Sequence, residues 1–344
     1  MQEVFVHPSG QDDNLGDSAL REGLLKAVRT GSSRRLHVLV EEQSADYISG
    51  LPLMRDDLVY RSRRDWASSM MAAQRPALIV NAGEINPPDG LIYPHPARAA
   101  EMRIARERGG AVIAAGIGLK APSVVPAVTF DKEFRAATLV SWRDQGSREA
   151  AGFGSMAPDW AFSLGRAESD WVEPAARTVV AVTLRFDRQW PGDAWIRAVR
   201  NLAARTHTRI VTVAQVARDM PRAVHLAGAL GGEYSCAPTT RHRDVDRHVR
   251  SIYAKSLVVV SDRAHALIMG ATEGAYPVGT AADPQKIQRI LAAAGLSRLT
   301  GHHRQLEHRA SQLGSALGEL PLAIRSARGA VAGLTARISE ILDG

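Results

Sequence analysis

The sequence has little of several residue types that would point to particular kinds of protein. Cys236 is the only cysteine, so no internal disulfide can form and a fold that depends on oxidative export is not indicated. Aromatic residues make up 5% of the 344 residues, which argues against a stacking platform for single-stranded nucleic acid. The chain has no apolar run of about 18 residues that could span a membrane, and no pattern of a secretion signal near its start. We therefore expect a cytoplasmic protein with no nucleic-acid partner.

The charge that is present is mostly arginine, and the formal net charge is +7. Arginine suits bidentate recognition of carboxylates and phosphates. A composition rich in alanine and arginine can also reflect genomic bias, and both explanations stay open. The hydrophobic share of 45% is ordinary for a globular protein, and the length favours two domains.

Short apolar runs alternate with helical patterns along most of the chain, which predicts parallel sheets with crossover helices. The alternation pauses between residues 163 and 177 and then starts again. We predict an α/β fold of two Rossmann-like, doubly wound domains facing a cleft, residues 1–168 and 175–300. A helical tail, residues 301–344, should follow and be broken or kinked at Pro321. Whether this tail crosses back to the first domain stays open.

In open parallel sheets, ligands bind outside the carboxyl ends of the strands, so polar residues at those ends are candidates for a site. After the first expected strand, Asn14, Gly16 and Asp17 should form a tight turn at the start of a helix. Such a turn can hold an anion on its backbone N–H groups. It can equally be an Asx-turn with a helix cap that needs no ligand.

Other strand ends carry further candidates. The carboxylate of Glu84 follows the third expected strand, and a glycine turn at residues 115–119, which would let a substrate approach the backbone, leads to Lys120 after the fourth. Arg143 follows the fifth strand beside Asp144, a plausible helix cap, and Arg185 occupies the equivalent place in the second half. These side chains would line the carboxyl edges of the two sheets.

The strongest local pattern is a hydrophobic strand at residues 258–260 that turns into an apolar helix carrying Arg263 and His265 in its first turn. A helix N-terminus favours an anion, arginine adds a bidentate contact, and histidine can move protons near neutral pH. The alternative is an ordinary surface helix start. The histidines near residues 302–308 lack ligands at metal spacing, so no metal is expected. The mixed charges of residues 241–248 predict a solvated face.

Taken together, these elements resemble the polysaccharide pyruvyl transferase family. The family's Asn-x-Gly-Asp matches residues 14–17, its Arg-Asp-x-x-Ser matches residues 143–147, and its Pro-Asp pair matches residues 158–159. Its strand-ending Ser-Leu-Arg is matched by residues 183–185, and its Arg-Leu-His-Ala by residues 263–266, followed by Pro-Val-Gly at residues 277–279. Order and spacing agree over residues 1–280, whereas the tail beyond residue 285 matches no known pattern.

The resemblance implies a GT-B-like fold and an enzyme that transfers a pyruvyl group from phosphoenolpyruvate to a sugar as a ketal. The acceptor would be a bacterial surface glycan or its lipid-linked precursor, which leaves peripheral contact with the inner membrane face as an expectation. No cofactor is implied, and the oligomeric state is not indicated. His265 would be the acid/base group, with Arg143, Arg185 and Arg263 as anion clamps. Asn14 and Asp17 would orient the acceptor.

The sequence departs from the family pattern at two places. Residues 81–84 replace a turn richer in glycine, and Ala264 stands where leucine is usual. These differences leave two alternatives open, a nucleotide-sugar glycosyltransferase of the same fold and a non-catalytic scaffold of a glycan-assembly complex. Binding of phosphoenolpyruvate rather than a nucleotide diphosphate would distinguish the first alternative from pyruvyl transfer.

Overall fold

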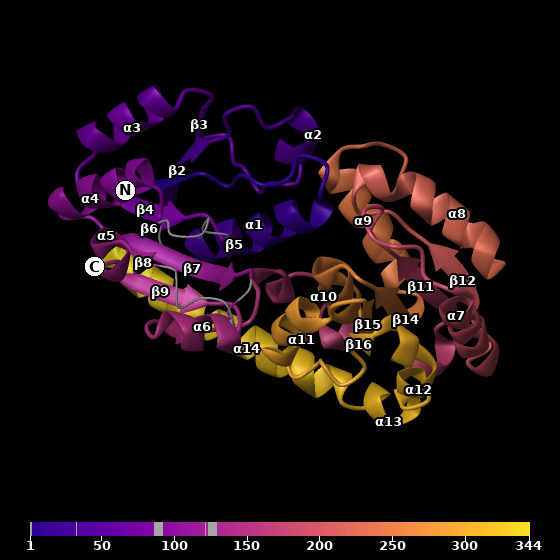
Figure 1. Cartoon of the computed structure of the whole chain (residues 1–344). Helices are drawn as coiled ribbons and strands as arrows, with labels where there is room; N and C mark the ends of the chain where they lie inside the picture. The colour runs from indigo at the N-terminus through magenta and orange to yellow at the C-terminus, as the bar shows by residue number, and fades with distance from the viewer. Residues whose placement is uncertain (1, 32, 86–91, 121, 123–128) are drawn as a thin grey trace. The chain divides into compact units, whose positions relative to one another are not determined.

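A computed structural model describes residues 2–31, 33–85, 92–120, 122 and 129–344 of the chain (Figure 1). The chain divides into two compact units. The first unit contains residues 1–12, 20–160 and 330–344, and the second contains residues 13–19 and 161–329. The passage between the units near residue 160 lies N-terminal to the boundary expected at residues 168–175. The short segment 13–19 also belongs to the second unit, although it precedes almost all of the first in sequence.

The first unit is built on a parallel sheet with strand order β10-β9-β7-β4-β1-β2-β3, in which β5 also pairs with β7. Its strands are β1 (Gln2–Val6), β2 (Arg34–Leu39), β3 (Leu58–Tyr60), β4 (Ala77–Val80), β5 (Gly83–Ile85), β7 (Val112–Leu119), β9 (Leu139–Trp142) and β10 (Ser155–Met156). A separate pair joins β6 (Ile92–Tyr93) to β8 (Thr129–Phe130). The helices are α1 (Leu15–Val28), α2 (Ala45–Ile48), α3 (Arg63–Ala72), α4 (Pro96–Glu107), α5 (Lys132–Arg135) and α6 (Gln145–Ala151).

Both faces of this sheet are covered, as the apolar strands predict. Val4 and Val6 of β1 pack into one hydrophobic cluster, while Phe5 between them packs into a second. The same alternation holds in β4, where Ile79 and Leu78 belong to different clusters. Since neighbouring side chains of a strand point to opposite faces, each face of the sheet has its own core, as in a doubly wound fold.

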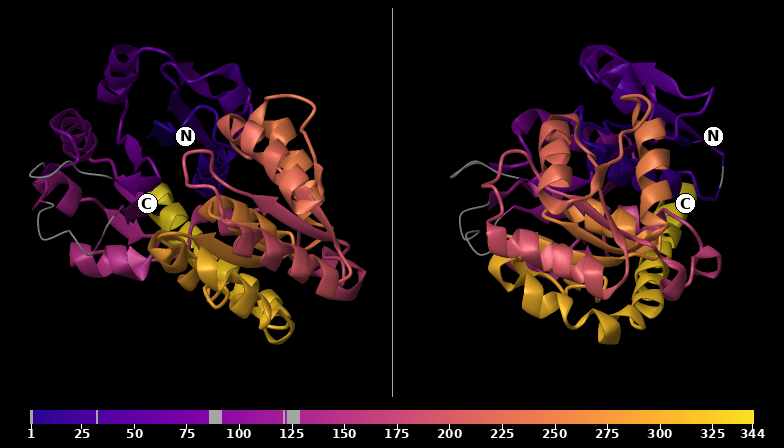
Figure 2. Two further views of the ribbon diagram at one scale, coloured as in Figure 1. Left: turned by 45° about the vertical axis from the view of Figure 1, so that its right-hand side comes forward. Right: turned by 90° about the vertical axis from the view of Figure 1, so that its right-hand side faces the viewer.

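The second unit has a six-stranded parallel sheet of order β13-β12-β11-β14-β15-β16. Figure 2 shows the strands and helices of this unit in rose, orange and yellow. Its strands are β11 (Val179–Thr183), β12 (Arg209–Thr212), β13 (Glu233–Tyr234), β14 (Ser256–Ser261), β15 (Tyr276–Ala281) and β16 (Gly301–His302). The helices are α7 (Asp193–Arg205), α8 (Met220–Leu230), α9 (His242–Tyr253), α10 (Ala264–Thr272), α11 (Gln285–Ala292), α12 (Leu306–Ala310) and α13 (Leu313–Leu317). Short 3-10 helices also occur, among them η5 (Ala217–Asp219) before α8.

The C-terminal helix α14 (Leu320–Asp343) is shared between the two units. Ile324 near its start packs in the second unit's core, and Ile338 near its end packs in the first unit's core. The predicted break at Pro321 is confirmed, because the helical tail is interrupted at residues 318–319, between α13 and α14. Pro321 is the second residue of the helix, where no intrahelical N–H bond is needed and its fixed φ suits the first turn.

A buried arginine fastens the end of α14 within the first unit. Arg34 donates hydrogen bonds to the carbonyl of Val28, to Ser339 and, at 2.7 Å, to the carboxylate of Asp343. Its side chain is fully buried, so these oxygens replace the water that the guanidinium would otherwise bind. Among the residues that the structure describes, no helix is both long enough and apolar enough to cross a bilayer.

Candidate active site in the second unit

The segment Asp13–Ala19 joins the second unit through paired backbone and charged groups. Asn14 forms an antiparallel bridge with Val216, and the N–H of Leu15 donates to the carbonyl of Gln215 at 3.0 Å. Asp13 forms a bidentate ion pair with Arg218, at 2.7 and 2.9 Å. The start of α1 is therefore held beside the loop that follows β12.

The expected turn at the start of α1 is an Asx-turn. The side-chain oxygen of Asn14 accepts the N–H of Gly16 at 3.1 Å, and its carbonyl accepts the N–H of Asp17 at 3.0 Å. This confirms the local prediction, and it also gives the turn a fixed shape without a ligand. Asp17 consequently lies in the first turn of α1, where the helix dipole favours a carboxylate.

Gly16 lies against the imidazole of His265. A Cβ atom built on Gly16 would be 2.6 Å from Nδ1 of His265 and 2.7 Å from its Cβ, closer than real Cβ contacts allow. The glycine therefore provides the space that the histidine ring occupies. Two sequence motifs that are 249 positions apart in the chain, at residues 16 and 265, thus form one cluster in the second unit.

The turn that carries Arg263 and His265 is fixed by buried hydrogen bonds. Ser261 at the end of β14 accepts the N–H of Arg263 at 2.9 Å and donates to the carbonyl of Thr183 at 2.7 Å. Every residue of α10 from Ala266 to Thr272 is buried, so the helix is a core element rather than a surface helix. The alternative of an ordinary surface helix start is therefore wrong.

Asp219 holds the guanidinium of Arg263. The Nε of Arg263 donates to one carboxylate oxygen of Asp219, and the other oxygen accepts the N–H of Phe186 at 2.9 Å. Asp219 is completely buried, so the ion pair is shielded from solvent on that side. Arg263 is consequently held in one orientation at the N-terminus of α10.

A second carboxyl group, Asp262, ties the same turn to the end of β11. It accepts the backbone N–H of Arg185 at 2.9 Å. Burial raises the pKa of Asp262 to about 6, against the lowering effect of the bond from Arg185 and the charge of Arg263. This group therefore changes protonation close to physiological pH.

The side chain of Arg185 is engaged with a neighbouring carboxylate. It forms a bidentate pair with Asp187 at 2.8 and 2.6 Å, and the hydrogen bond from Arg185 lowers the pKa of Asp187 to about 2. Both side chains are about one third or more exposed. A donor anion that binds Arg185 in the same way would take the place of Asp187.

Three of the sequence-predicted site residues, Glu84, Lys120 and Arg143, belong to the first unit. Arg143 is buried between two carboxylates, with Glu84 at 3.5 Å and Asp159 at 3.4 Å. Asp144 caps α6 through the N–H of Ser147 at 2.9 Å, which confirms its predicted capping role. The convergence of Arg143 with Arg185 and Arg263 on one anion stays a prediction.

The glycine turn expected at residues 115–119 is wrong, because β7 continues through these residues to Leu119 with a bulge after Ala115. A Cβ on Gly116 would collide with the indole of Trp160, and one on Gly118 would lie 2.6 Å from Nε of Arg143. Protein side chains therefore occupy the space beside both glycines. Glu84, expected in a loop, lies in β5, and exposed Lys120 directly follows β7.

His7, another histidine at a strand end, lies in a charged network of the first unit. Its Nε2 is 2.9 Å from Glu41, and its Nδ1 is 2.6 Å from Arg98 and 3.3 Å from Arg63. Burial first, and the charge of Arg98 second, lower the pKa of His7 to about 4. His7 is therefore neutral at physiological pH and is less suited than an accessible histidine to deliver a proton there.

Sequence reasoning missed three polar residues of the second unit, Asp219, Asp262 and His242. The sequence shows an acidic residue, Asp262, between Ser261 and Arg263, but no local pattern indicates that its carboxyl group is buried. His242 begins α9 in the run expected to be a solvated face, and that prediction is wrong for this residue, which is buried and contacts Ser18 at 2.8 Å. Asp219 precedes a helix whose second residue is proline. This pattern predicts the start of a helix, but it does not predict the ion pair of Asp219 with Arg263.

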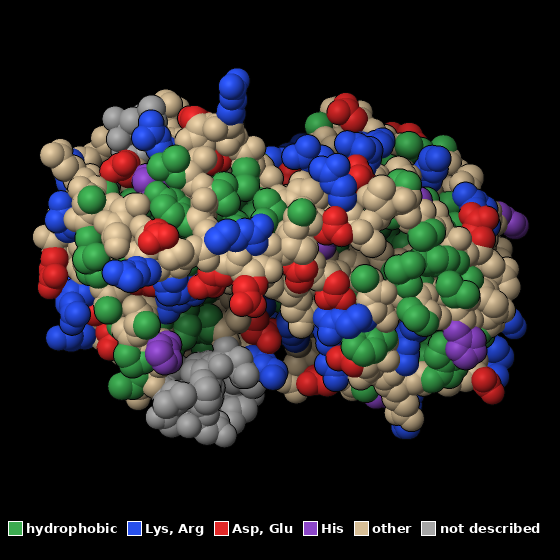
Figure 3. All heavy atoms as spheres, turned by 90° about the horizontal axis from the view of Figure 1, so that it is seen from above, with side chains coloured by type: hydrophobic (Ala, Val, Ile, Leu, Met, Phe, Trp, Pro, Cys, Tyr) green, Lys and Arg blue, Asp and Glu red, His purple; other side chains and the backbone are tan. Residues whose placement is uncertain are grey.

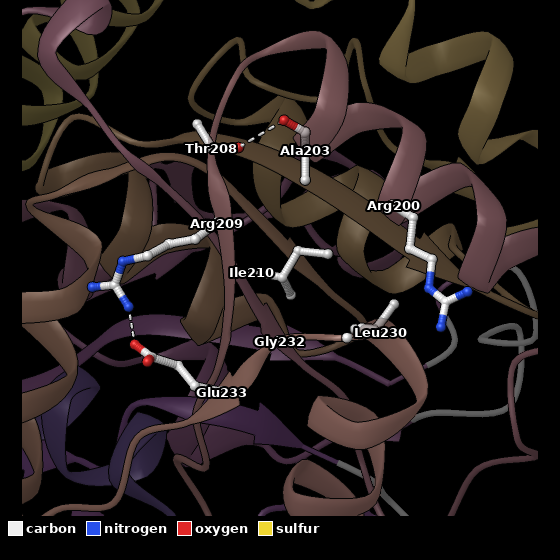
Figure 4. A pocket seen from close by; sticks show the side chains of 9 residues that line it. Arg200, Ala203, Thr208, Arg209, Ile210, Leu230, Gly232 and Glu233 are labelled. Atoms are coloured by element: carbon white, nitrogen blue, oxygen red, sulfur yellow. Dashed lines mark hydrogen bonds and ion pairs between the residues drawn. The ribbon is translucent and has the colours of Figure 1, made fainter.

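A pocket of about 410 Å³ lies elsewhere in the second unit, at the amino-terminal end of β12 (Figure 4). It is lined by α7 and by the start of β13, and Arg209 pairs with Glu233 at its rim. Ligands of parallel α/β sheets bind at the carboxyl ends of strands, so we do not expect this pocket to be the active site. Within the described ranges, no group of three or more His, Cys, Asp or Glu side chains could hold a metal ion.

Solved structures with the same arrangement define the class of fold. HepE of Anabaena, solved in complex with UDP, matches with a TM-score of 0.56 and 11% identity over 100% of both chains. UDP-GlcNAc 2-epimerase from Neisseria meningitidis, bound to UDP-GlcNAc, matches with a TM-score of 0.53 and 9% identity over 98% of this chain and 99% of that one. MnaA of S. aureus with UDP gives a TM-score of 0.51 and 13% identity over 93% and 91% of the two chains. The predicted GT-B-like α/β fold is confirmed.

The sequence itself gives the family. The model of the polysaccharide pyruvyl transferase family matches residues 14–283, which include the Asn14 turn and the His265 helix. The chain belongs to the polysaccharide pyruvyl transferase family. No curated protein sequence matches the chain.

Proposed function

We propose that this protein transfers the pyruvyl group of phosphoenolpyruvate to a sugar of a bacterial surface polysaccharide or of its lipid-linked precursor. In this reaction the methylene carbon of phosphoenolpyruvate gains a proton, while a sugar hydroxyl loses its proton and bonds to the neighbouring carbon. The bond from that carbon to the phosphate oxygen breaks, and phosphate leaves. A second hydroxyl of the same sugar then closes the cyclic ketal and loses its proton.

The observation that carries this proposal is the cluster of Gly16, His265 and Arg263 in the second unit. It brings a group that can transfer protons and a fixed cation to the N-terminus of one buried helix. The donor has two anionic groups, a phosphate and a carboxylate, and this helix end already favours negative charge. Membership in the family supports the same assignment.

We assign His265 as the acid/base group of the reaction. It is the second residue of α10, and its ring is fixed on one side by Gly16. Positioned acid/base groups typically contribute about 10²–10⁴-fold to a rate. Asn14 and Asp17 belong to the same cluster and would orient the sugar hydroxyls.

We assign Arg263 and Arg185 as the contacts of the second unit to the donor's anionic groups. Arg263 is pre-oriented by Asp219, so it loses little freedom when an anion binds. Arg185 must exchange its bond with Asp187 for the donor. Arg143 of the first unit, which is buried between Glu84 and Asp159, stays a predicted contact to the donor. No cofactor and no metal are part of this proposal.

A nucleotide-sugar glycosyltransferase is the second candidate, because HepE and MnaA were solved with UDP and share the fold. Thermal-shift measurements with phosphoenolpyruvate and with UDP distinguish the two. Stabilisation by phosphoenolpyruvate that disappears in Arg263→Ala supports pyruvyl transfer. Stabilisation by UDP alone would support glycosyl transfer, and stabilisation by neither ligand would favour a scaffold.

A further inference from the structure

The loop between β11 and α7 and the start of α8 form an exposed surface rich in aromatic, apolar and basic side chains. Phe186 of the loop is 41% exposed, and Met220 and Val224, one turn apart on α8, are 37% and 54% exposed. Figure 3 shows hydrophobic side chains gathered on the part of the second unit where α8 lies. We define the α8 surface by six residues: Phe186, Arg188, Trp190, Met220, Arg222 and Val224.

Arginine side chains hold the aromatic residues of this surface in place. The guanidinium of Arg222 lies 5.7 Å from the centre of the Trp190 ring and donates to the backbone carbonyl of Arg188 at 2.6 Å. Arg218 lies over the Phe186 ring at 5.3 Å. The loop and the helix are thereby joined into one surface whose aromatic rings keep a fixed position before any partner binds.

The charge of the α8 surface is positive. Three carboxylates beside it are already paired, Asp187 with Arg185, Asp13 with Arg218 and Asp219 with Arg263. Neither Arg188 nor Arg222 forms an ion pair with a carboxylate in the part of the chain that the structure describes. The surface therefore offers cations beside apolar and aromatic side chains, a combination suited to the boundary between anionic headgroups and acyl chains.

The α8 surface is continuous with the candidate active site. The N–H of Phe186 donates to Asp219, the residue that holds Arg263, and Arg218 pairs with Asp13, next to Asn14. Both contacts lie within the second unit, at the carboxyl ends of β11 and β12. A partner that covers the α8 surface would bring its own groups to the Asn14 turn and the start of α10.

We propose that the α8 surface docks on the face of an anionic phospholipid bilayer, so that the sugar of a lipid-linked acceptor is presented to the site beside it. The choice of a lipid-linked acceptor rests on the proposed function, whereas the docking itself does not. Met220 and Val224 enter the headgroup region, Phe186 and Trp190 lie at its boundary, and Arg188 and Arg222 contact lipid phosphates.

Co-sedimentation of the full-length protein with vesicles tests this docking. We expect binding to phosphatidylcholine vesicles that contain phosphatidylglycerol, weaker binding to phosphatidylcholine alone, and loss of binding as salt is raised. The double variant Met220→Ser/Val224→Ser should bind roughly tenfold more weakly because its apolar contact is lost. Arg188→Ala/Arg222→Ala should bind weakly and with little dependence on salt. Leu322→Ser, which changes a 69% exposed residue on α14, is the matched control and should bind as wild type.

The same variants separate docking from catalysis. Met220→Ser/Val224→Ser should release phosphate from phosphoenolpyruvate at the wild-type rate with a water-soluble sugar acceptor. If no variant or wild-type protein releases phosphate but vesicle binding behaves as above, the proposed function fails and the docking stands. The docking proposal would be overturned if wild-type protein did not bind anionic vesicles, or if the Met220→Ser/Val224→Ser variant bound them as well as wild type. Loss of a dimer in that variant, measured by light scattering without vesicles, would identify a self-association surface instead.

Discussion

Gly16 and His265 occupy adjoining space, since a Cβ atom at Gly16 would come within 2.6 Å of Nδ1 of His265. Gly16→Ala should therefore displace the imidazole and lower the turnover number by about 10²-fold or more, as expected for a mispositioned acid/base group. Alanine adds no backbone strain at Gly16, which has no positive φ, but its Cβ also meets the Cβ of His265 at 2.7 Å, so thermal unfolding of the variant is measured alongside. The measurement is phosphate release at saturating phosphoenolpyruvate.

The matched control is Gly329→Ala in α14, where an added Cβ meets no atom within 4 Å. It should keep wild-type turnover. Wild-type turnover in Gly16→Ala would show that the position of the His265 ring does not matter for the reaction.

Asp219 should affect donor binding through Arg263. Asp219→Asn keeps an acceptor for the N–H of Phe186 but removes the charged partner of Arg263. We expect the KM for phosphoenolpyruvate to rise about tenfold, which corresponds to about 1.4 kcal/mol, with a smaller change in kcat.

Asp187→Asn should instead leave the KM for phosphoenolpyruvate unchanged or lower it, because it releases the exposed Arg185. Equal effects of the two substitutions would refute different roles for these carboxylates.

The raised pKa of Asp262 has a defined effect on stability. Its folded pKa of about 6 lies above the unfolded value near 3.8, so the folded protein binds the proton more tightly. The resulting contribution to the free energy of unfolding is complete below pH 3.8 and is lost as the pH rises through about 6. Asp262→Asn keeps the acceptor for Arg185 without this titration. The variant should gain about 1–3 kcal/mol relative to wild type between pH 4 and pH 7.5.

Urea unfolding of both proteins across this pH range measures that difference. His7 contributes with the opposite sign, because its folded pKa of about 4 lies below the unfolded value near 6.5. Its contribution is present above pH 6.5 and is lost as the pH falls through about 4, equally in both proteins. A stability difference between Asp262→Asn and wild type that does not change with pH would contradict the assignment.

The end of α14 should be necessary for the stability of the first unit. Ile338 is fully buried in that unit's core, so Ile338→Ala should lower the free energy of unfolding by about 2–5 kcal/mol. Leu322→Ala on the same helix removes a side chain that is 69% exposed and should change stability little. Denaturant unfolding of the two variants measures this difference. Equal free energies of unfolding would show that the end of α14 does not stabilise the core of the first unit.

The sequence predicted the central strands and most helices because their apolar runs and caps are local signals. The helical pattern of residues 145–151 predicts α6 at its observed bounds, and the apolar run of residues 138–142 predicts β9 with one residue more than the structure has. Short strands such as β3, whose Leu58 and Val59 are exposed, carry no such signal and were missed. The ordered motifs were sufficient to identify the family and the GT-B-like fold.

The site was only partly predictable, because its contacts join distant segments. No local pattern indicates that residues 13–19 belong with residues 161–329, or that Asp219 pairs with Arg263, 44 positions away. The glycines of β7 were misread for the same reason, since their neighbours Trp160 and Arg143 come from later segments. Polar residues at strand ends could be recognised from the sequence, but the partners that position them could not.

The central claim is that His265 transfers the proton in pyruvyl transfer from phosphoenolpyruvate. The most direct measurement incubates wild type and His265→Asn with phosphoenolpyruvate and a set of sugar acceptors, and follows phosphate release and the acceptor mass. We predict that wild type adds the mass of one pyruvate less one water and releases one phosphate per acceptor. His265→Asn should bind phosphoenolpyruvate nearly as well and turn over about 10²–10⁴-fold more slowly. Near-normal turnover in His265→Asn, with loss of activity in His7→Asn or Glu84→Gln, would contradict this account.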